Sequence, residues 1–267
     1  MKVLYIVGLG RSGSTLVDIL LDAHSGIQSL GGVRRLNHYA ANRPCPCGAP
    51  DFGACPFWSR VDAELERRIG RSLTSVDVHA RDHRRFAEHN RAVFEAAARV
   101  AGVDVVVDNS KSVGRLRRLM AVDGLEVLPI HVARDPRGRA QSLRKRNSRG
   151  YLPTLTYSHR SLRAFALLRD RPHIAVDYDR LAASPGTEVP KLMARIGVVF
   201  EPAQLRWAEA RHHNIGSADV LRGSRGSTIR VDDAWERAMP PHARRIVSVL
   251  AWPGLVATRA KLRRWGL

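Results

Sequence analysis

The first residues of the chain pass from a hydrophobic strand, through a turn of small residues, into an apolar stretch with helical spacing. We expect the strand over residues 2–7 and the helix over residues 14–23. Glycines in the turn allow the backbone to approach an anion closely, and the amides of residues 10–14 can point toward it. The helix presents the positive end of its dipole to the same place. This segment predicts a phosphate-binding loop at the end of a first strand.

The loop resembles a Walker A loop in its spacing but not in its chemistry. Gly8 and Gly13 have the G-x-x-x-x-G spacing, whereas Ser14 stands where that motif has its lysine. A nucleotide triphosphate with magnesium is therefore disfavoured, and Arg11 is expected to supply the missing positive charge. A P-loop kinase or phosphotransferase stays open as an alternative, because it would have the same architecture with different chemistry.

A second anion site is predicted at the end of a later strand. Residues 126–133 form a buried hydrophobic run, and Asp135 and Pro136 then suit the first positions of a helix. Arg134 consequently lies at the carboxyl end of the strand. Ser142 lies six residues beyond Pro136, about 9 Å along the helix axis. An arginine and a hydroxyl placed in this way can bind one phosphate from two sides.

Together the two motifs resemble those of the sulfotransferases that use 3′-phosphoadenosine 5′-phosphosulfate (PAPS), most closely the bacterial and carbohydrate-type branch. The resemblance implies that the first loop binds the 5′-phosphosulfate and that Arg134 and Ser142 bind the 3′-phosphate. Residues 107–111 and 177–181 are similar to two further elements of the family, and residues 222–225 to a late loop that closes over the nucleotide. The residues so assigned to the cofactor are Gly10, Arg11, Ser12, Gly13, Ser14, Thr15, Arg134, Ser142, Arg222, Gly223, Ser224 and Arg225.

Sulfuryl transfer from such a donor needs positive charge at the departing 5′-phosphate, because negative charge builds on its bridging oxygen. Arg11 and the loop amides are predicted to supply that charge. Lys111 comes just past a predicted strand over residues 103–108, at the same sheet edge, and is predicted to reach the bridging oxygen. These cations can replace the magnesium of phosphoryl-transfer enzymes, so no metal requirement is predicted, and the product is adenosine 3′,5′-bisphosphate.

The general base of the related enzymes is missing from this sequence. They commonly carry a glutamate after the second strand, but Gly32 stands there, and no carboxylate occurs between Asp22 and Asp51. His38 is the nearest substitute and is predicted as a catalytic residue, because imidazole titrates near neutral pH. Asp108 is a second candidate, and an acceptor that supplies its own base is a third possibility.

The order of expected elements predicts an α/β fold with a P-loop-like, mainly parallel sheet flanked by helices. The chain is expected to form a single sulfotransferase-like domain over residues 1–267. Residues 31–101, between the second and third strands, exceed what a simple crossover needs and are predicted to form an inserted acceptor-side subdomain. The strands are expected near residues 2–7, 26–30, 103–108, 126–133 and 173–177. The helices are expected near residues 14–23, 58–70, 83–101, 113–122, 136–146, 157–170, 187–197, 202–212 and 241–251.

All three cysteines of the chain, Cys45, Cys47 and Cys55, lie in this insertion. They can remain reduced as a local structural element, form a disulfide through Cys55, or bind zinc with His38 as a fourth ligand. Their spacing is not the C-x-x-C pair typical of structural zinc, and a cytoplasm keeps thiols reduced. The reduced state is therefore favoured and no metal site is predicted.

The net charge of +19 is larger than a single PAPS molecule requires. An acidic acceptor, anionic lipid or nucleic acid would use the excess, although many arginines on solvated faces explain it equally well. A polyanion- or nucleic-acid-binding protein without catalysis is a further alternative. Aromatic residues make up only 6% of the chain, so specific nucleic-acid binding is not expected.

No segment approaches the roughly 20 apolar residues that a membrane span needs, and a cytoplasmic location is predicted. The basic residues 259–265 can make a peripheral membrane contact, although Pro253 and Gly254 are expected to break the amphipathic stretch before them. The sequence predicts a PAPS-dependent O-sulfotransferase that acts on a hydroxyl of a carbohydrate, glycolipid or secondary metabolite. It does not identify the acceptor or the oligomeric state.

Overall fold

Five strands form one sheet in the computed structural model, which describes residues 1–144, 154–217, 221, 229 and 231–267. The strands are β1 (Lys2–Gly8), β2 (Ile27–Ser29), β3 (Val105–Asp108), β4 (Glu126–Ala133) and β5 (Ile174–Asp177). Their order is β2-β3-β1-β4-β5, and β1 with β3, β2 with β3, and β4 with β5 pair in parallel. The predicted mainly parallel sheet is confirmed, with each strand close to its expected range.

The contacts within the chain divide it into two compact units. The first unit comprises Met1–Ile6, Thr15–Leu128 and Glu201–Ser227, and the second comprises Val7–Ser14, Pro129–Phe200 and Thr228–Leu267. The loop predicted to bind phosphate and Arg134 therefore belong to the second unit. Lys111 and the whole of the insertion belong to the first unit.

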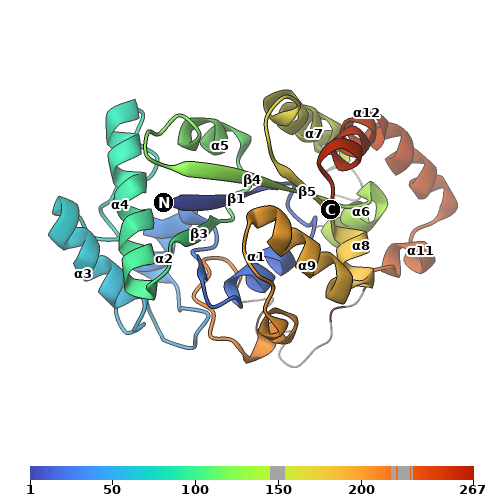
Figure 1. Ribbon diagram of the computed structural model, residues 1–267. Helices are drawn as coiled ribbons and strands as arrows, with labels where there is room; N and C mark the ends of the chain where they lie inside the picture. Colours follow the sequence, from blue (N-terminus) through green and yellow to red (C-terminus); the bar gives the residue numbers. More distant parts are fainter. Residues whose placement is uncertain (145–153, 218–220, 222–228, 230) are drawn as a thin grey trace. The chain divides into compact units, whose positions relative to one another are not determined.

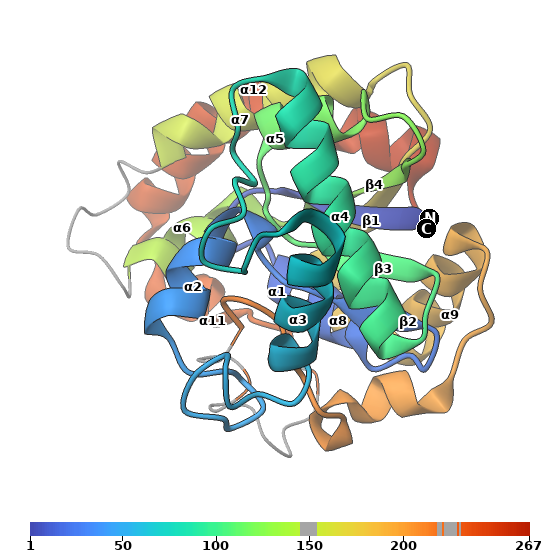
Figure 2. The ribbon, with the colours of Figure 1, turned by 90° about the vertical axis from the view of Figure 1, so that its left-hand side faces the viewer.

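In the first unit, helix α4 packs on β2 and β3 and lies beside α3 (Figures 1 and 2). It begins where the Asp82 side chain accepts a hydrogen bond from the Arg85 amide, and it ends at Gly102, whose φ of 70° suits a glycine. Its apolar face packs with side chains that include Phe86 and Phe94, both buried. The helices of this unit are α1 (Ser14–Asp22), α2 (Leu36–Asn42), α3 (Trp58–Ile69), α4 (His83–Ala101) and α5 (Val113–Leu119), with the 3-10 helices η1 (Val33–Arg35) and η3 (Pro202–Glu209).

In the second unit, α12 packs against α7, α6 and β5, and α9 also contacts β5 (Figure 1). The helices are α6 (Pro136–Arg144), α7 (Leu155–Leu168), α8 (Tyr178–Ala183), α9 (Pro185–Ile196), α11 (Ala234–Ala238) and α12 (Pro241–Trp265). The short helices α2, α8 and α11 were not expected from the sequence, because too few residues repeat in them to show a helical period. The helix expected over residues 202–212 is the 3-10 helix η3.

The expectation that Pro253 and Gly254 break the last helix is wrong. Helix α12 continues through both residues to Trp265. The hydroxyl of Ser158, on α7, donates to the carbonyl oxygen of Leu250 at 2.8 Å and accepts from the Gly254 amide at 3.3 Å. Ser158 thus provides hydrogen bonds to backbone groups of α12 on either side of Pro253. Gly254 allows α7 and α12 to pack closely, since a Cβ there would lie 2.7 Å from Ser158 Cα.

The apolar strand that opens the sequence is the centre of the sheet. Residues 3–7 of β1 are completely buried, as a strand between two neighbours should be.

Within the described part of the chain, no helix is both long enough and apolar enough to cross a membrane.

Candidate active site

Two buried arginines of the second unit hold the backbone of the loop between β1 and α1. Arg139 Nε donates to the carbonyl oxygen of Gly10 at 3.0 Å, and Arg134 Nη1 donates to that of Arg11 at 3.3 Å. Because the C=O and N–H of one trans peptide point in opposite directions, the Arg11 amide points away from Arg139. Burial lowers the pKa of Arg139 to about 10, so its guanidinium remains charged at neutral pH.

The loop turns through the left-handed region at two residues. Arg11 has a φ of 71° and Gly13 a φ of 82°. Left-handed turns of this kind direct backbone amides into a concavity that suits an anion. Ser12 and Ser14 are buried, Thr15 is half-buried, and Gly10 is exposed with nothing within 4 Å of a Cβ placed on it.

The other glycines of the loop serve packing. A Cβ on Gly8 would lie 2.8 Å from the carbonyl oxygen of Val132, and one on Gly13 would overlap the ring of Tyr178. Tyr178 is in turn one of the residues 177–181 that the sequence singled out. Of the three glycines of the loop, Gly10 is thus the one beside open space, whereas Gly8 and Gly13 are required by neighbouring protein atoms.

Arg134 lies at the end of β4, as predicted, and its side chain is only 4% exposed. Its Nη2 donates to Asp232 Oδ2 at 2.8 Å, and its guanidinium lies 4.8 Å from the centre of the Tyr178 ring. Its Nε is buried and has no hydrogen-bond partner in the part of the chain that the structure describes. Gly138 makes room for this group, because a Cβ there would lie 3.1 Å from Nε. A buried donor of this kind fits an anionic ligand.

The predicted helix start after Arg134 is confirmed. Asp135 Oδ1 accepts from the Arg137 amide at 2.7 Å, and Pro136 is the first residue of α6. Burial would raise the pKa of Asp135, but hydrogen bonds from the Arg137 side chain and amide outweigh it and lower the pKa. Ser142 is half-buried on the same helix.

Lys111 lies in the first unit, directly after β3, with its amide donating to the carbonyl oxygen of Ile6 at 3.2 Å. Its φ is 60°. Among the non-glycine residues that the structure describes, only Arg11 and Lys111 have a positive φ. Such conformations cost about 1–3 kcal/mol and cluster at functional sites. The two strained residues are the two cations that the sequence predicted as catalytic.

Asp108, the second candidate for the base, has a different role in the structure. It is completely buried, and its Oδ2 accepts from Arg115 Nε at 2.9 Å. Its Oδ1 accepts from the Ser110 amide at 2.9 Å and from the Ser110 hydroxyl. Both carboxylate oxygens are therefore engaged inside the protein, and the side chain orients the segment that leads to Lys111.

The turn after β2 is closed by a segment from late in the chain. Ile215 accepts a hydrogen bond from the Gly32 amide at 3.0 Å and donates to the carbonyl oxygen of Leu30 at 3.0 Å. Gly31 has a φ of 66°, and a Cβ on it would overlap the Ile215 backbone. Gly32 is different, since a Cβ there has ordinary contacts of 3.7 Å or more. His38 lies on α2 beyond this turn and is exposed.

Sequence reasoning missed Asp18, on α1. It is buried, its Oδ1 accepts from the Ser29 hydroxyl at 2.5 Å, and its Oδ2 has no hydrogen-bond partner among the described residues. Burial raises the pKa of Asp18 to about 6, against hydrogen bonds from Ser29 and Asn109. An acidic residue inside an otherwise apolar helix was the signal that could have identified it.

The predicted late loop of Arg222, Gly223, Ser224 and Arg225 lies outside the described residues. The residues after it are described from 231 onward, and Asp232 among them is the ion-pair partner of Arg134. The indole of Trp235, on α11, lies under the Arg137 guanidinium at 4.1 Å. The segment after the late loop therefore contributes to the surroundings of Arg134.

A profile of the sulfotransferase family matches residues 4–202 of the 267. The sulfotransferase domain of the olefin synthase from Synechococcus PCC 7002 has a TM-score of 0.63 at 18% identity, covering 97% of this chain and 94% of that domain. The sulfotransferase domain of the curacin biosynthetic pathway has a TM-score of 0.60 at 16% identity, covering 94% and 97%. Sulfotransferase STF1 from Mycobacterium tuberculosis H37Rv has a TM-score of 0.50 at 17% identity, covering 83% and 75%. No curated protein matches significantly.

At these identities the solved structures establish a common fold, and the profile extends over most of the chain. The loop after β1 and the arginine after β4 agree with the chemistry of a family that binds an anionic donor. The chain therefore belongs to the sulfotransferase family, and it is an enzyme of sulfuryl transfer.

Proposed function

We propose that the second unit binds PAPS, the usual donor of this family, and that the enzyme sulfates a hydroxyl group of a carbohydrate, glycolipid or secondary metabolite. The observation that carries the donor assignment is the contact of Arg134 with the loop, through its hydrogen bond to the Arg11 carbonyl. The arginine proposed for the 3′-phosphate and the loop proposed for the 5′-phosphosulfate are thereby neighbours within one compact unit. The buried Nε of Arg134 supports the same assignment, because it lies 3.9 Å from Asp179 Oδ1 and has no hydrogen-bond partner among the described residues.

The proposed binding and catalytic roles are assigned to the residues that the sequence predicted. The amides of Gly10–Ser14 and the side chains of Ser12, Ser14 and Thr15 bind the 5′-phosphosulfate, and Ser142 assists Arg134. Bound PAPS supplies an activated sulfuryl group whose departure leaves negative charge on a phosphate. Arg11 neutralises that phosphate, and Lys111 stabilises the charge that develops at the bridging oxygen. The family resemblance adds Arg222, Gly223, Ser224 and Arg225 as residues that cover the nucleotide.

The strained backbones of Arg11 and Lys111 support this assignment. A left-handed conformation costs stability, and it persists where surrounding contacts fix a side chain in a direction that function requires. The fixed orientation also removes the cost of reorganising the two cations during reaction.

We propose His38 as the general base, because it is the nearest titratable side chain to the turn where related enzymes carry a glutamate. Asp18 is a second candidate, since its raised pKa is suited to accepting a proton near neutral pH. Exposure favours His38, because an acceptor can reach it, whereas Asp18 is only 1% exposed.

Calorimetric titration of the protein with adenosine 3′,5′-bisphosphate, adenosine 5′-monophosphate and ATP tests the donor assignment. We expect the bisphosphate to bind most tightly and without magnesium, because Arg134 and Ser142 recognise its 3′-phosphate. Preference for ATP, with transfer activity that is lost in chelator and restored by magnesium, would establish the kinase alternative instead.

We also propose a peripheral membrane contact through α12. Four large apolar side chains on one side of this helix are at least half exposed: Ile246, Val249, Trp252 and Val256. Exposed Arg245 and Arg259 flank them, so the helix combines an apolar strip with positive charge. Co-sedimentation with phosphatidylserine vesicles, but not with phosphatidylcholine vesicles, is expected for wild type and lost in Trp252→Glu. This contact is compatible with the predicted cytoplasmic location, which stays a prediction.

A further inference from the structure

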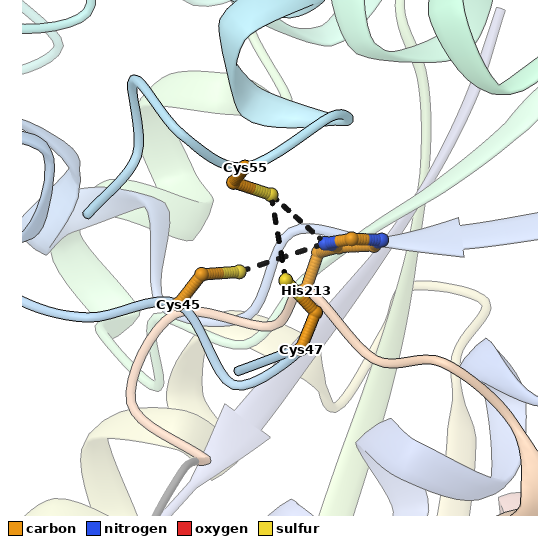
Figure 3. Close-up of side chains that lie close together, drawn as sticks. All are labelled: Cys45, Cys47, Cys55 and His213. Atoms are coloured by element: carbon orange, nitrogen blue, oxygen red, sulfur yellow. Dashed lines mark hydrogen bonds between the residues drawn. The ribbon is translucent and has the colours of Figure 1, made fainter. Parts of the chain in front are cut away.

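The side chains of three cysteines and one histidine of the first unit lie close together (Figure 3). The residues are Cys45, Cys47, Cys55 and His213, and their ligand atoms all lie within 4.8 Å of one another. The sequence suggested His38 as a possible fourth member, but the structure brings in His213, from a segment far along the chain. Cys45, Cys55 and His213 are buried and Cys47 is half-buried.

Three distances between ligand atoms in this cluster are close to those of a tetrahedral zinc site. With Zn–S bonds of about 2.3 Å and Zn–N bonds of about 2.0–2.1 Å, two sulfur ligands lie about 3.8 Å apart, and a sulfur and a nitrogen about 3.5 Å apart. Cys47 Sγ and Cys55 Sγ are 3.7 Å apart. His213 Nδ1 is 3.5 Å from Cys45 Sγ and 3.2 Å from Cys55 Sγ. These three distances are close to those between ligands that share one zinc ion, and all four ligand atoms lie within 4.8 Å of one another.

The backbone positions the sulfur atoms through two short turns. The Gly48 amide donates to the Cys45 carbonyl oxygen at 3.1 Å, and the φ of 103° at Gly48 is a conformation that favours glycine. Cys55 precedes α3, where the amides of Phe57 and Trp58 donate to its sulfur. These backbone contacts place the sulfur atoms of Cys45 and Cys55 beside the same histidine nitrogen.

His213 is held so that Nδ1 faces the sulfur atoms (Figure 3). Its ring stacks on Phe57 with 4.9 Å between centroids, and its backbone carbonyl accepts from Trp58 Nε1 at 3.0 Å. These two aromatic residues begin α3, so the same segment that carries Cys55 also fixes the histidine. His213 Nδ1 thus contacts two of the three cysteine sulfurs, and the third, Cys47 Sγ, contacts Cys55 Sγ. Three cysteines and one histidine are the donor set of a structural Cys₃His zinc site.

We propose that Cys45, Cys47, Cys55 and His213 bind one Zn²⁺ as a structural site. Three thiolates and a neutral imidazole fill all four positions, so the metal has no open position for substrate and takes no part in sulfuryl transfer. A disulfide is the competing state, but the sulfur atoms of Cys47 and Cys55 are not bonded, and all three cysteines are free. Zinc explains the convergence of all four side chains, whereas a disulfide would use only two.

The proposed site connects two parts of the first unit that are distant in sequence. Cys45 and Cys55 belong to the insertion, and His213 belongs to the segment whose Ile215 closes the turn at Gly31 and Gly32. Zinc would therefore fix the insertion against the segment that covers the turn after β2.

Metal analysis of the reduced wild-type protein, purified without chelator, is the first test. We expect about one zinc per chain by inductively coupled plasma mass spectrometry, and an X-ray absorption spectrum with about three sulfur atoms near 2.3 Å and one nitrogen near 2.0 Å. Replacement by Co²⁺ should give thiolate charge-transfer bands and the d–d bands of a tetrahedral site. Metal-free protein that also fails to bind Co²⁺, or a disulfide found by mass spectrometry of protein purified without reductant, would overturn the proposal.

His213→Ala and His38→Ala form a matched pair of variants. Loss of an outer-shell partner weakens metal sites by about 10–100-fold, so loss of a ligand in His213→Ala should weaken zinc binding at least as much in competition with a chelator. His38→Ala should bind zinc as wild type does. If His213→Ala does not fold, the Co²⁺ spectrum of wild type decides the question. Equal zinc affinity in His213→Ala and wild type would refute His213 as a ligand.

Discussion

The loop after β1 and the turn after β2 both follow a strand and both depend on glycine, but their backbones have different partners. In the loop, the carbonyls of Gly10 and Arg11 are bound by two buried arginines, and Gly10 borders open space. In the turn, the Leu30 carbonyl and the Gly32 amide are bound by the backbone of Ile215, and a Cβ on Gly31 would overlap that backbone. The first backbone thus borders open space at Gly10, whereas the second is closed at Gly31 by the protein itself.

A glycine after a strand is found for one of two reasons: protein atoms approach it closely, or the space beside it is open. Glycine is required at Gly31 because protein atoms approach it, and it is required at Gly8 and Gly13 for the same reason. At Gly10, by contrast, no atom lies within 4 Å of a Cβ placed on it. A glycine motif therefore indicates close approach, and the structure decides whether the neighbour is protein or ligand.

Among the variants that test this comparison, Gly32→Glu is expected to change kcat the most. It restores an acid at the turn where related enzymes have their base. A positioned general base contributes about 10²–10⁴-fold to rate, which sets the upper limit of the gain in kcat. The Cβ has room at this position. Steady-state kinetics over a range of pH are the measurement.

The companion variant His38→Ala should lower kcat while keeping its affinity for adenosine 3′,5′-bisphosphate. Unchanged rates in both variants would show that neither position faces the acceptor hydroxyl, and would direct the search to Asp18 or to the acceptor itself.

Lys111→Met should lower kcat by about 10²–10³-fold, the usual cost of removing a group that stabilises developing charge. Its bisphosphate affinity should change much less, because the charge develops only during transfer. Lys191→Met is the control, since Lys191 is a partly exposed lysine paired with Glu188. A normal kcat in Lys111→Met would remove this residue from the catalytic machinery.

Arg134→Ala should weaken bisphosphate binding by about 10–150-fold, since charge-assisted hydrogen bonds contribute about 1.5–3 kcal/mol. Ser142→Ala should cost about 1 kcal/mol, or roughly fivefold. Isothermal titration calorimetry measures both, with Arg169→Ala, at an exposed arginine, as control. If wild type binds nucleotides with and without the 3′-phosphate equally well, the assignment of both residues is wrong.

Gly31→Ala should lower the free energy of unfolding by about 1–3 kcal/mol, because it combines a left-handed backbone with a clash against Ile215. Gly10→Ala should change stability by less than about 1 kcal/mol, since nothing lies near its Cβ. Urea denaturation distinguishes them. Similar losses in both variants would mean that the loop is as closely packed as the turn.

Arg11→Gly is expected to change the free energy of unfolding the least, and to raise it where Gly31→Ala lowers it. Relief of the left-handed conformation should raise the free energy of unfolding by up to about 1 kcal/mol, while sulfuryl transfer falls. A loss of both stability and activity would show that the Arg11 side chain holds the loop together rather than serving the reaction.

Much of the fold could be predicted because its signals are local. The apolar run of β1, the small residues of the loop and the Asp135-Pro136 helix start each depend on neighbours within a few positions. The position of Arg134 at a strand end followed from the same pattern. Short helices such as α8 could not be predicted, since one or two turns carry too little periodicity.

By itself the sequence determined the five strands, the longer helices and the family, because these depend on residue types at fixed spacing. Only the tertiary structure decided that His213 joins the cysteines, that Asp108 is neutralised by Arg115, and that α12 continues past Pro253 beside Ser158. Each of these depends on a partner distant along the chain or on another element. Local spacing does not specify such partners, because packing of whole helices and strands brings them together.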